Sequence, residues 1–251
     1  MRNIRLLLQY EGSRYQGWQR QKSSDNTIQG KLEALLSRMC GEEIELHASG
    51  RTDAGVHAKG QVANFHTNCA MDVGEMKDYM KQYLPEDIVV KDLSEAGPRF
   101  HSRLNAIGKK YRYLVMDGEV PDVFLRRFAL HHPEKLDMDA MRRAADRLLG
   151  EHDFKAFTST KKSKKSTVRR IDSIEIEKKE NVIAFTFCGN GFLYHMVRIM
   201  MGTILEVGRG ERSLESIDEL FVSGKREEAG YLVPAKGLTL VEVYYHREKD
   251  A

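Results

Sequence analysis

The chain of 251 residues has few cysteines and no long apolar run. Its three cysteines, Cys40, Cys69 and Cys188, are an odd number and lie far apart, so they predict reduced thiols and no disulfide framework. The stretch from Ile4 to Leu8 is too short for a signal-peptide core, and nothing approaches the roughly 18 apolar residues that a membrane-spanning helix needs. We therefore expect a cytoplasmic protein that does not enter a membrane.

A set of metal ligands is also missing from the sequence. Cys69 follows His66 by three residues, but no second pair completes a four-ligand zinc set. His131 and His132 are adjacent, and adjacent side chains point apart on a strand or a helix. We expect no structural metal.

The net charge of +3 is small, so the total charge alone does not indicate a nucleic-acid partner. The basic residues are nevertheless clustered. Residues 161–170 hold six lysines and arginines with no acid, and smaller clusters are Lys109–Arg112 and Arg126–Arg127. Local basic stripes on a near-neutral chain suit a protein that holds a polyanion at one face. A solvated lysine-rich loop remains the alternative for 161–170.

Hydrophobic periodicity predicts a mixture of strands and helices. Strands are expected at 3–10, 43–48, 60–66, 88–93, 109–116 and 238–245, with a hairpin of 169–178 and 182–188. Helices are expected at 27–39, 73–84, 138–149, 192–207 and 214–222, and 121–133 is expected to be irregular. Because many strands follow one another as neighbours, the pattern favours an α+β fold with largely antiparallel sheets over a doubly wound parallel sheet.

The segment 50–58 contains the densest group of residues suited to chemistry. It falls between two predicted strands, so it is expected to form a loop at the edge or top of a sheet. Gly50 and Gly55 permit a tight backbone, and Arg51 beside Asp53 favours the ionised carboxylate. An acid held in this way can serve as a nucleophile or a base. The alternative is a turn-forming aspartate in a surface ion pair.

The chain resembles the TruA family of tRNA pseudouridine synthases over almost its whole length. The run from Arg51 to His57 matches the family's signature around its catalytic aspartate. Further motifs of the family occur in the same order at Tyr10–Arg20, Gly60–Val62, Phe100–Arg103, Lys110–Tyr113, Leu149–Phe154, Phe192–Arg198 and Gly237–Leu238. Each motif alone is modest, but their order and spacing together are specific.

The resemblance implies a role for each of three side chains: Asp53 is the nucleophile, Tyr111 packs on the target uracil, and Arg198 pairs with Asp53. Arg51 is the other candidate partner of the acid. Pseudouridine formation breaks the bond between ribose C1′ and uracil N1 and rejoins the base through C5. This involves no redox change and no second substrate, so no cofactor or metal is required. Without the resemblance, Tyr111 reads as a core strand residue and Arg198 as a surface residue of a helix.

The resemblance also implies the architecture and the partner. It implies two similar lobes, each with a largely antiparallel sheet flanked by helices, and a central active-site cleft; we place the lobes at 1–105 and 106–251. A homodimer would bind the anticodon stem-loop of tRNA and modify positions 38, 39 and 40. Residues expected to contact the RNA, mostly its phosphates, are Phe100, His101, Ser102, Arg103, Leu104, Lys161, Lys162, Ser163, Lys164 and Lys165.

Two departures from the family pattern leave the substrate range open: Glu11 stands where an aspartate is usual, and Ile199 where an asparagine is often found. Two other function classes remain as alternatives. One is an RNA-binding module of the same fold without catalysis. The other is a nucleotide-dependent enzyme with a glycine-rich loop at 189–191, but Tyr194 occupies the third glycine position and no Gly-Lys-Ser/Thr follows.

Overall fold

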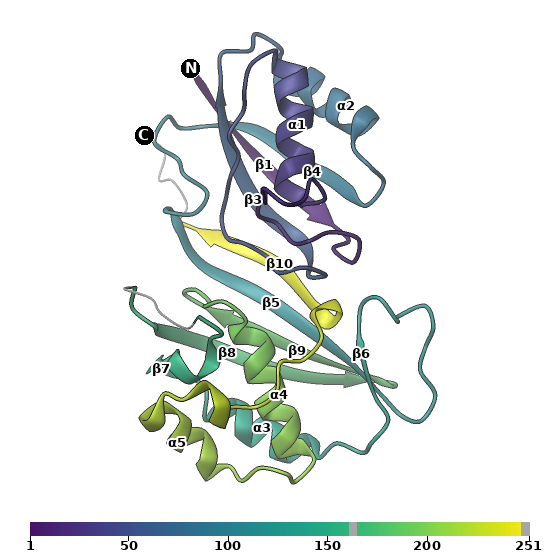
Figure 1. Ribbon diagram of the computed structural model, residues 1–251, viewed down its shortest axis with the longest axis vertical. Helices are drawn as coiled ribbons and strands as arrows, with labels where there is room; N and C mark the ends of the chain where they lie inside the picture. Colours follow the sequence, from purple (N-terminus) through teal and green to yellow (C-terminus); the bar gives the residue numbers. More distant parts are fainter. Residues whose placement is uncertain (161–164, 247–251) are drawn as a thin grey trace. The chain divides into compact units, whose positions relative to one another are not determined.

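The computed structural model describes residues 1–160 and 165–246, and it divides the chain into two compact units. The first unit comprises Met1–Ile107 and the C-terminal stretch from Thr239, and the second is Gly108–Leu238 (Figure 1). The predicted second lobe was 106–251. The last strand instead groups with the first unit, because it pairs in parallel with a strand there, with Thr239 opposite His57.

The first unit is a mainly antiparallel sheet with two helices. Its elements are β1 (Arg2–Tyr10), α1 (Ile28–Cys40), β2 (His47–Ala48), β3 (His57–Thr67), α2 (Val73–Tyr83), β4 (Ile88–Ala96) and β10 (Leu238–Tyr245). Strand β1 lies between β3 and β4 and is antiparallel to both, while β2 is antiparallel to β3. Ile4, Leu6 and Leu8 alternate along β1 and have no exposed surface. They therefore belong to the core of the first unit, in which α1 and α2 cover one face of the sheet (Figure 1).

Local signals fix both helices of the first unit. The hydroxyl of Thr27 accepts a hydrogen bond from the Gly30 backbone N–H at the start of α1, and Gly41 ends the helix in the left-handed region with φ 68°. Helix α2 begins with a capping box in which Asp72 and Glu75 each bond the other's backbone N–H. The ends of both helices lie within one residue of the predicted ranges, 27–39 and 73–84.

The second unit has a sheet and three helices. Its elements are β5 (Ala106–Asp117), β6 (Leu130–His132), α3 (Met138–Asp146), β7 (Gly150–Asp153), β8 (Val168–Lys179), β9 (Val182–Gly189), α4 (Met196–Gly208) and α5 (Glu215–Ser223), with 3₁₀ turns at Phe154–Phe157, Arg226–Glu228 and Ala235–Gly237. The order β5-β9-β8-β7 is antiparallel throughout, and β6 adds a parallel partner to β5.

One face of this second sheet forms the core with the helices. Tyr113 lies opposite Phe185 and Val115 lies opposite Ile183, and all four have no exposed surface. Helix α4 is buried along nearly its whole length, and α3 packs beside it (Figure 1). The expectation of an α+β fold with largely antiparallel sheets is confirmed, as is the hairpin of β8 and β9, which turns at Glu180 and Asn181.

Three predicted elements have wrong bounds, and two strands were not predicted. The strand expected at 43–48 is reduced to His47–Ala48, and the helix expected from 192 begins only at Met196. The helix expected to reach 149 ends at Asp146, where turns lead to Gly150 at φ 94°. Strands β6 and β7 were not anticipated, and β6 falls inside the stretch expected to be irregular.

Candidate active site

Asp53 lies in the loop between β2 and β3, in the first unit. The backbone N–H of Val56 donates to the Asp53 carbonyl at 3.1 Å, and Gly55 inside this turn has φ 80°. A residue with a β-carbon is strained at that angle, which accounts for the glycine. Asp53 is half-buried and Arg51 is exposed. The predicted loop is found at residues 49–56, but His57 and Ala58, at the end of the predicted segment, belong to β3.

Hydrogen bonds between buried polar side chains stabilise the loop that carries Asp53. The hydroxyls of Tyr10 and Thr52 are 2.8 Å apart, and both residues are buried. Gln61, with no exposed surface, accepts from the Ser49 hydroxyl at 2.7 Å and donates to the Gly50 carbonyl at 2.9 Å. Since a buried polar group is costly to leave unpaired, these bonds restrict the loop to one conformation.

Tyr10 acts in this network as a neutral phenol. Burial raises the pKa of Tyr10 to about 12, although the hydrogen bonds to Thr52 and Gln61 oppose that change. The hydroxyl therefore keeps its proton at neutral pH. Tyr10 can orient the loop, but it is not placed to act as a base.

Two glycines allow the segment after β1 to pack directly on the Asp53 loop. A β-carbon at Gly12 would lie 2.0 Å from the Val56 carbonyl oxygen, and one at Gly17 would lie 2.8 Å from that of Thr52. The Trp18 N–H donates to the Thr52 carbonyl at 2.9 Å. The segment after β1 thus contacts the backbone of the Asp53 loop so closely that neither Gly12 nor Gly17 has room for a β-carbon.

Tyr111 and Arg198 belong to the second unit. Tyr111 is buried on β5, with its ring against the edge of Phe192 at a centroid distance of 5.1 Å. Arg198 lies in the first turn of α4, and its Nε donates to the Val233 carbonyl at 2.8 Å. Each side chain is therefore held in one orientation by its own unit.

The loop from Phe100 to Leu104 presents only part of its residues to solvent. Ser102 is fully buried, and its hydroxyl donates to the His47 carbonyl at 2.6 Å. The ring of His101 stacks on His47 at 5.0 Å, and desolvation together with the charges of His47 and Arg103 lowers the pKa of His101. Arg103 and Leu104 are exposed, whereas Phe100 is half-buried. Ser102 therefore anchors the loop, and Arg103 and Leu104 face outward.

The basic tract lies largely outside the described residues. Lys161, Lys162, Ser163 and Lys164 fall there, and Lys165, the first residue after the gap, is exposed. Within residues 1–160 and 165–246, no three histidine, cysteine or acidic side chains are grouped to hold a metal ion. In that same part of the chain, no helix is both long and apolar enough to cross a membrane.

Comparison with known families identifies the class of protein. A family model described as tRNA pseudouridine synthase matches residues 7–105 and 144–246, so the match reaches into both units. The chain belongs to the tRNA pseudouridine synthase family, and the resemblance drawn from the motifs is confirmed.

Individual relatives are similar over nearly the full length. The chain is 44% identical to the tRNA pseudouridine synthase A of Acetivibrio thermocellus, with 98% of this chain and 100% of that protein covered. It is 46% identical to the tRNA pseudouridine synthase A 1 of Clostridium tetani, with the same coverage. It is 41% identical to the tRNA pseudouridine synthase A 2 of Bacillus cereus, again over 98% of this chain and 100% of the relative.

Proposed function

We propose that this protein isomerises uridine to pseudouridine at positions 38, 39 and 40 in the anticodon stem-loop of tRNA, with Asp53 as the nucleophile or base and without a cofactor. The observation that carries the proposal is the rigid loop of Asp53, held by Tyr10, Thr52 and Gln61. Full-length similarity to proteins named tRNA pseudouridine synthase A supports the same reaction.

The reaction requires a carboxylic acid in a fixed position and a uracil that stays bound after it is detached from the ribose. The bond between C1′ and N1 breaks, the uracil rotates, and C1′ bonds to C5; C5 then loses its hydrogen while N1 gains one. Asp53 starts this sequence by attack or by taking a ribose proton. Tyr111 offers an aromatic face on which the uracil can turn. Arg198 neutralises the carboxylate, and Arg51 is the second candidate for that role.

We propose that the RNA is held mainly through its phosphates. Arg103 on the outward side of the 100–104 loop supplies one cationic contact, and the lysines of 161–165 supply others. Such contacts recognise the shape of a folded tRNA more than its sequence. The protein is proposed to act as a homodimer in the cytoplasm.

Mapping of pseudouridine in a tRNA transcript tests the function. The purified protein, with no nucleotide or metal added, is expected to produce pseudouridine in the anticodon arm. Asp53→Asn is nearly isosteric, so tRNA binding should change less than about threefold, whereas turnover should fall by roughly a thousandfold or more because the amide is a poor nucleophile and base.

Asp92→Asn is the matched control, because Asp92 is exposed on β4, outside the Asp53 loop. It should retain wild-type turnover. Turnover by Asp53→Asn within tenfold of wild type would overturn the role of Asp53. Tight binding of tRNA without any product from the wild type would instead favour a binding module, and a requirement for ATP or NAD would favour a nucleotide-dependent enzyme.

A further inference from the structure

Helix α4 carries Arg198, and an extended segment, residues 229–234, runs beside it without regular structure of its own. From Gly230 to Val233, the segment passes from the C-terminal half of α4 back toward its first turn. There the Arg198 Nε–H donates a 2.8 Å hydrogen bond to the Val233 carbonyl. Because a guanidinium is planar, a bond to Nε fixes the plane in which its two Nη groups point.

Close backbone packing brings the segment against the helix. A β-carbon at Gly202 would lie 1.9 Å from the Tyr231 carbonyl oxygen, and one at Gly230 would lie 2.3 Å from the Thr203 nitrogen. Thr203 Oγ1 accepts the Gly230 N–H at 3.0 Å while it donates to the Ile199 carbonyl. Only glycine on each side permits this approach.

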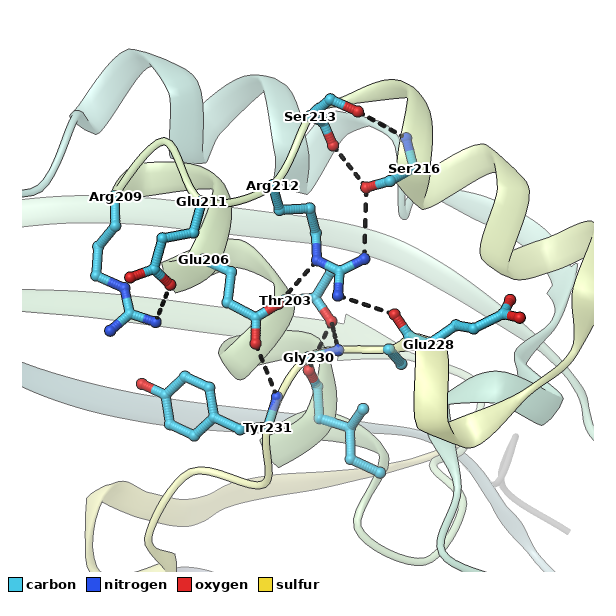
Figure 2. A network of polar contacts seen from close by, with 12 residues as sticks. Thr203, Glu206, Arg209, Glu211, Arg212, Ser213, Ser216, Glu228, Gly230 and Tyr231 are labelled. Atoms are coloured by element: carbon cyan, nitrogen blue, oxygen red, sulfur yellow. Dashed lines mark hydrogen bonds and ion pairs between the residues drawn. The ribbon is translucent and has the colours of Figure 1, made fainter.

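An ion pair then fixes the segment in place, as Figure 2 shows. One oxygen of Glu206 accepts the Tyr231 N–H at 3.1 Å, and the other accepts from Arg212 Nε at 2.8 Å. Both charged side chains have 17% exposed surface. The same guanidinium donates to the Glu228 carbonyl at 2.8 Å and reaches the Ser216 hydroxyl at 3.4 Å.

The geometry of Arg212 suits this task. Its planar fork meets acceptors in three places: the last turns of α4, helix α5 and the 3₁₀ turn just before the segment. A lysine could satisfy only part of this set, because an ammonium is a compact charge without a fork.

The 229–234 segment also forms a hydrogen bond with β5, the strand that contains Tyr111. The carbonyl of Pro234 accepts the Tyr113 hydroxyl at 2.8 Å, and Tyr113 lies two residues after Tyr111 on β5. A single segment therefore contacts the side chain of Arg198 and the strand of Tyr111.

We infer that Arg212 and Glu206 are positioning residues for Arg198: they fix the 229–234 segment so that the Val233 carbonyl sets the direction of the Arg198 guanidinium. The inference rests on the proposed function for the catalytic consequence, and on the hydrogen bonds alone for the positioning. Arg212 itself is not proposed to touch the substrate or Asp53.

An NMR measurement tests the positioning independently of catalysis. In the wild type, the Nε–H of Arg198 should give a resolved signal with slow hydrogen exchange. In Arg212→Met, that exchange should quicken by about tenfold or more, and Arg212→Lys should recover part of the protection. Arg142→Met is the matched control, because Arg142 pairs with Asp139 on the exposed side of α3. Unchanged exchange in folded Arg212→Met and Arg212→Lys would overturn the inference.

A double-mutant cycle tests the catalytic consequence. Under single-turnover conditions with a tRNA transcript, Arg212→Met should slow isomerisation by about tenfold or more and leave tRNA affinity within about twofold, since small displacements of a catalytic group are costly. In an Arg198→Met background, the same change should have almost no further effect on the rate. An equal loss in both backgrounds would show a general structural role and overturn the catalytic consequence of the positioning.

The two tests separate the inference from the proposed function. If the wild type forms no pseudouridine, the proposed function fails, while the exchange of the Arg198 Nε–H still decides whether Arg212 and Glu206 position that side chain. If the wild type is active and Arg212→Met loses protection, the cycle decides whether the positioning matters for the reaction.

Discussion

The sequence does not reveal the structural role of Tyr10, which is to hydrogen-bond the side chains of Thr52 and Gln61 near Asp53. The tyrosine belongs to one of the family motifs, as does Gln61, yet neither motif states that their side chains meet near Asp53. Tyr10 is 42 residues from Thr52 and 51 from Gln61 in the chain, and only the sheet brings them together. The candidate acid was predictable because Arg51, Asp53 and the glycines are local, whereas the network beneath it is not.

Tyr10→Phe tests the neutral role of this phenol. The change leaves Thr52 and Gln61 with one buried partner fewer, which should lower the free energy of unfolding by about 1–3 kcal/mol. The rate of isomerisation should fall, but the shape of the pH–rate profile between pH 6 and 9 should not change, because the pKa of Tyr10 is about 12 and the phenol stays protonated over that range.

Chemical denaturation and a pH series of single-turnover rates measure both effects. Tyr83→Phe serves as the control, since Tyr83 is 48% exposed. A basic limb that is present in wild type and lost in Tyr10→Phe would show that Tyr10 titrates during the reaction, contrary to the neutral role.

At the scale of elements, the wrong predictions have a common cause. Ile44 and Leu46 are buried on alternate positions, as a strand would place them. However, the Ile44 N–H donates to the Ser37 hydroxyl and the Leu46 N–H to Glu33, both on α1. Periodicity reports which side chains are buried, but it does not report what the backbone bonds to.

The start of α4 and the strand β7 show the same limit. The apolar run from Phe192 continues the helical pattern, yet His195 adopts φ 66° and interrupts it, and Phe192 packs on Tyr111. Strand β7 has no exposed-and-buried alternation, and it exists because Gly150–Asp153 pairs with β8. Each outcome depends on a distant partner, which a local pattern cannot supply.

Gly17→Ala tests whether the segment after β1 fixes the Asp53 loop. Gly17 has φ 86°, and a β-carbon there would lie 2.8 Å from the Thr52 carbonyl oxygen and 3.0 Å from the Ala54 nitrogen. Strain and overlap should destabilise the protein by about 1–3 kcal/mol and reduce turnover more than tRNA affinity.

Gly191→Ala is the matched substitution, because its β-carbon would meet only the Arg169 side chain, at 3.6 Å. Thermal unfolding, turnover and tRNA affinity are compared for both variants. If Gly17→Ala lowers stability but leaves turnover at the wild-type level, the contact supports folding and does not set the position of Asp53.

For the molecule as a whole, the sequence predicts the fold better than it predicts the RNA-binding surface. The model of the family covers 7–105 and 144–246, so all of β5, the stretch through β6 and the first part of α3 lie outside the match. The fold class was predictable because many predicted strands follow one another as neighbours in both units, with helices of clear period among them. How the molecule holds RNA was less predictable, since a net charge of +3 does not locate the contacts.

Measuring tRNA affinity at a series of salt concentrations distinguishes attraction by the net charge from contacts between individual lysines and phosphates. Replacing Lys161, Lys162, Lys164 and Lys165 by alanine should weaken tRNA binding and flatten its dependence on salt, by up to about 0.7–0.9 in the log–log slope for each lysine that contacts a phosphate. Turnover at saturating tRNA should change much less, because these side chains are proposed to hold the RNA and not to act on the base.

The control removes the same charge elsewhere, with exposed lysines of the first unit replaced by alanine: Lys31, Lys77, Lys81 and Lys91. Both variants lower the net charge equally, so a slope that changes only in the first locates the phosphate contacts in the basic tract. An equal change in both variants means that the attraction comes from net charge, because counterions are then released without regard to position. An unchanged slope in the first variant means that 161–165 is a solvated loop and that Arg103 and other cations hold the tRNA.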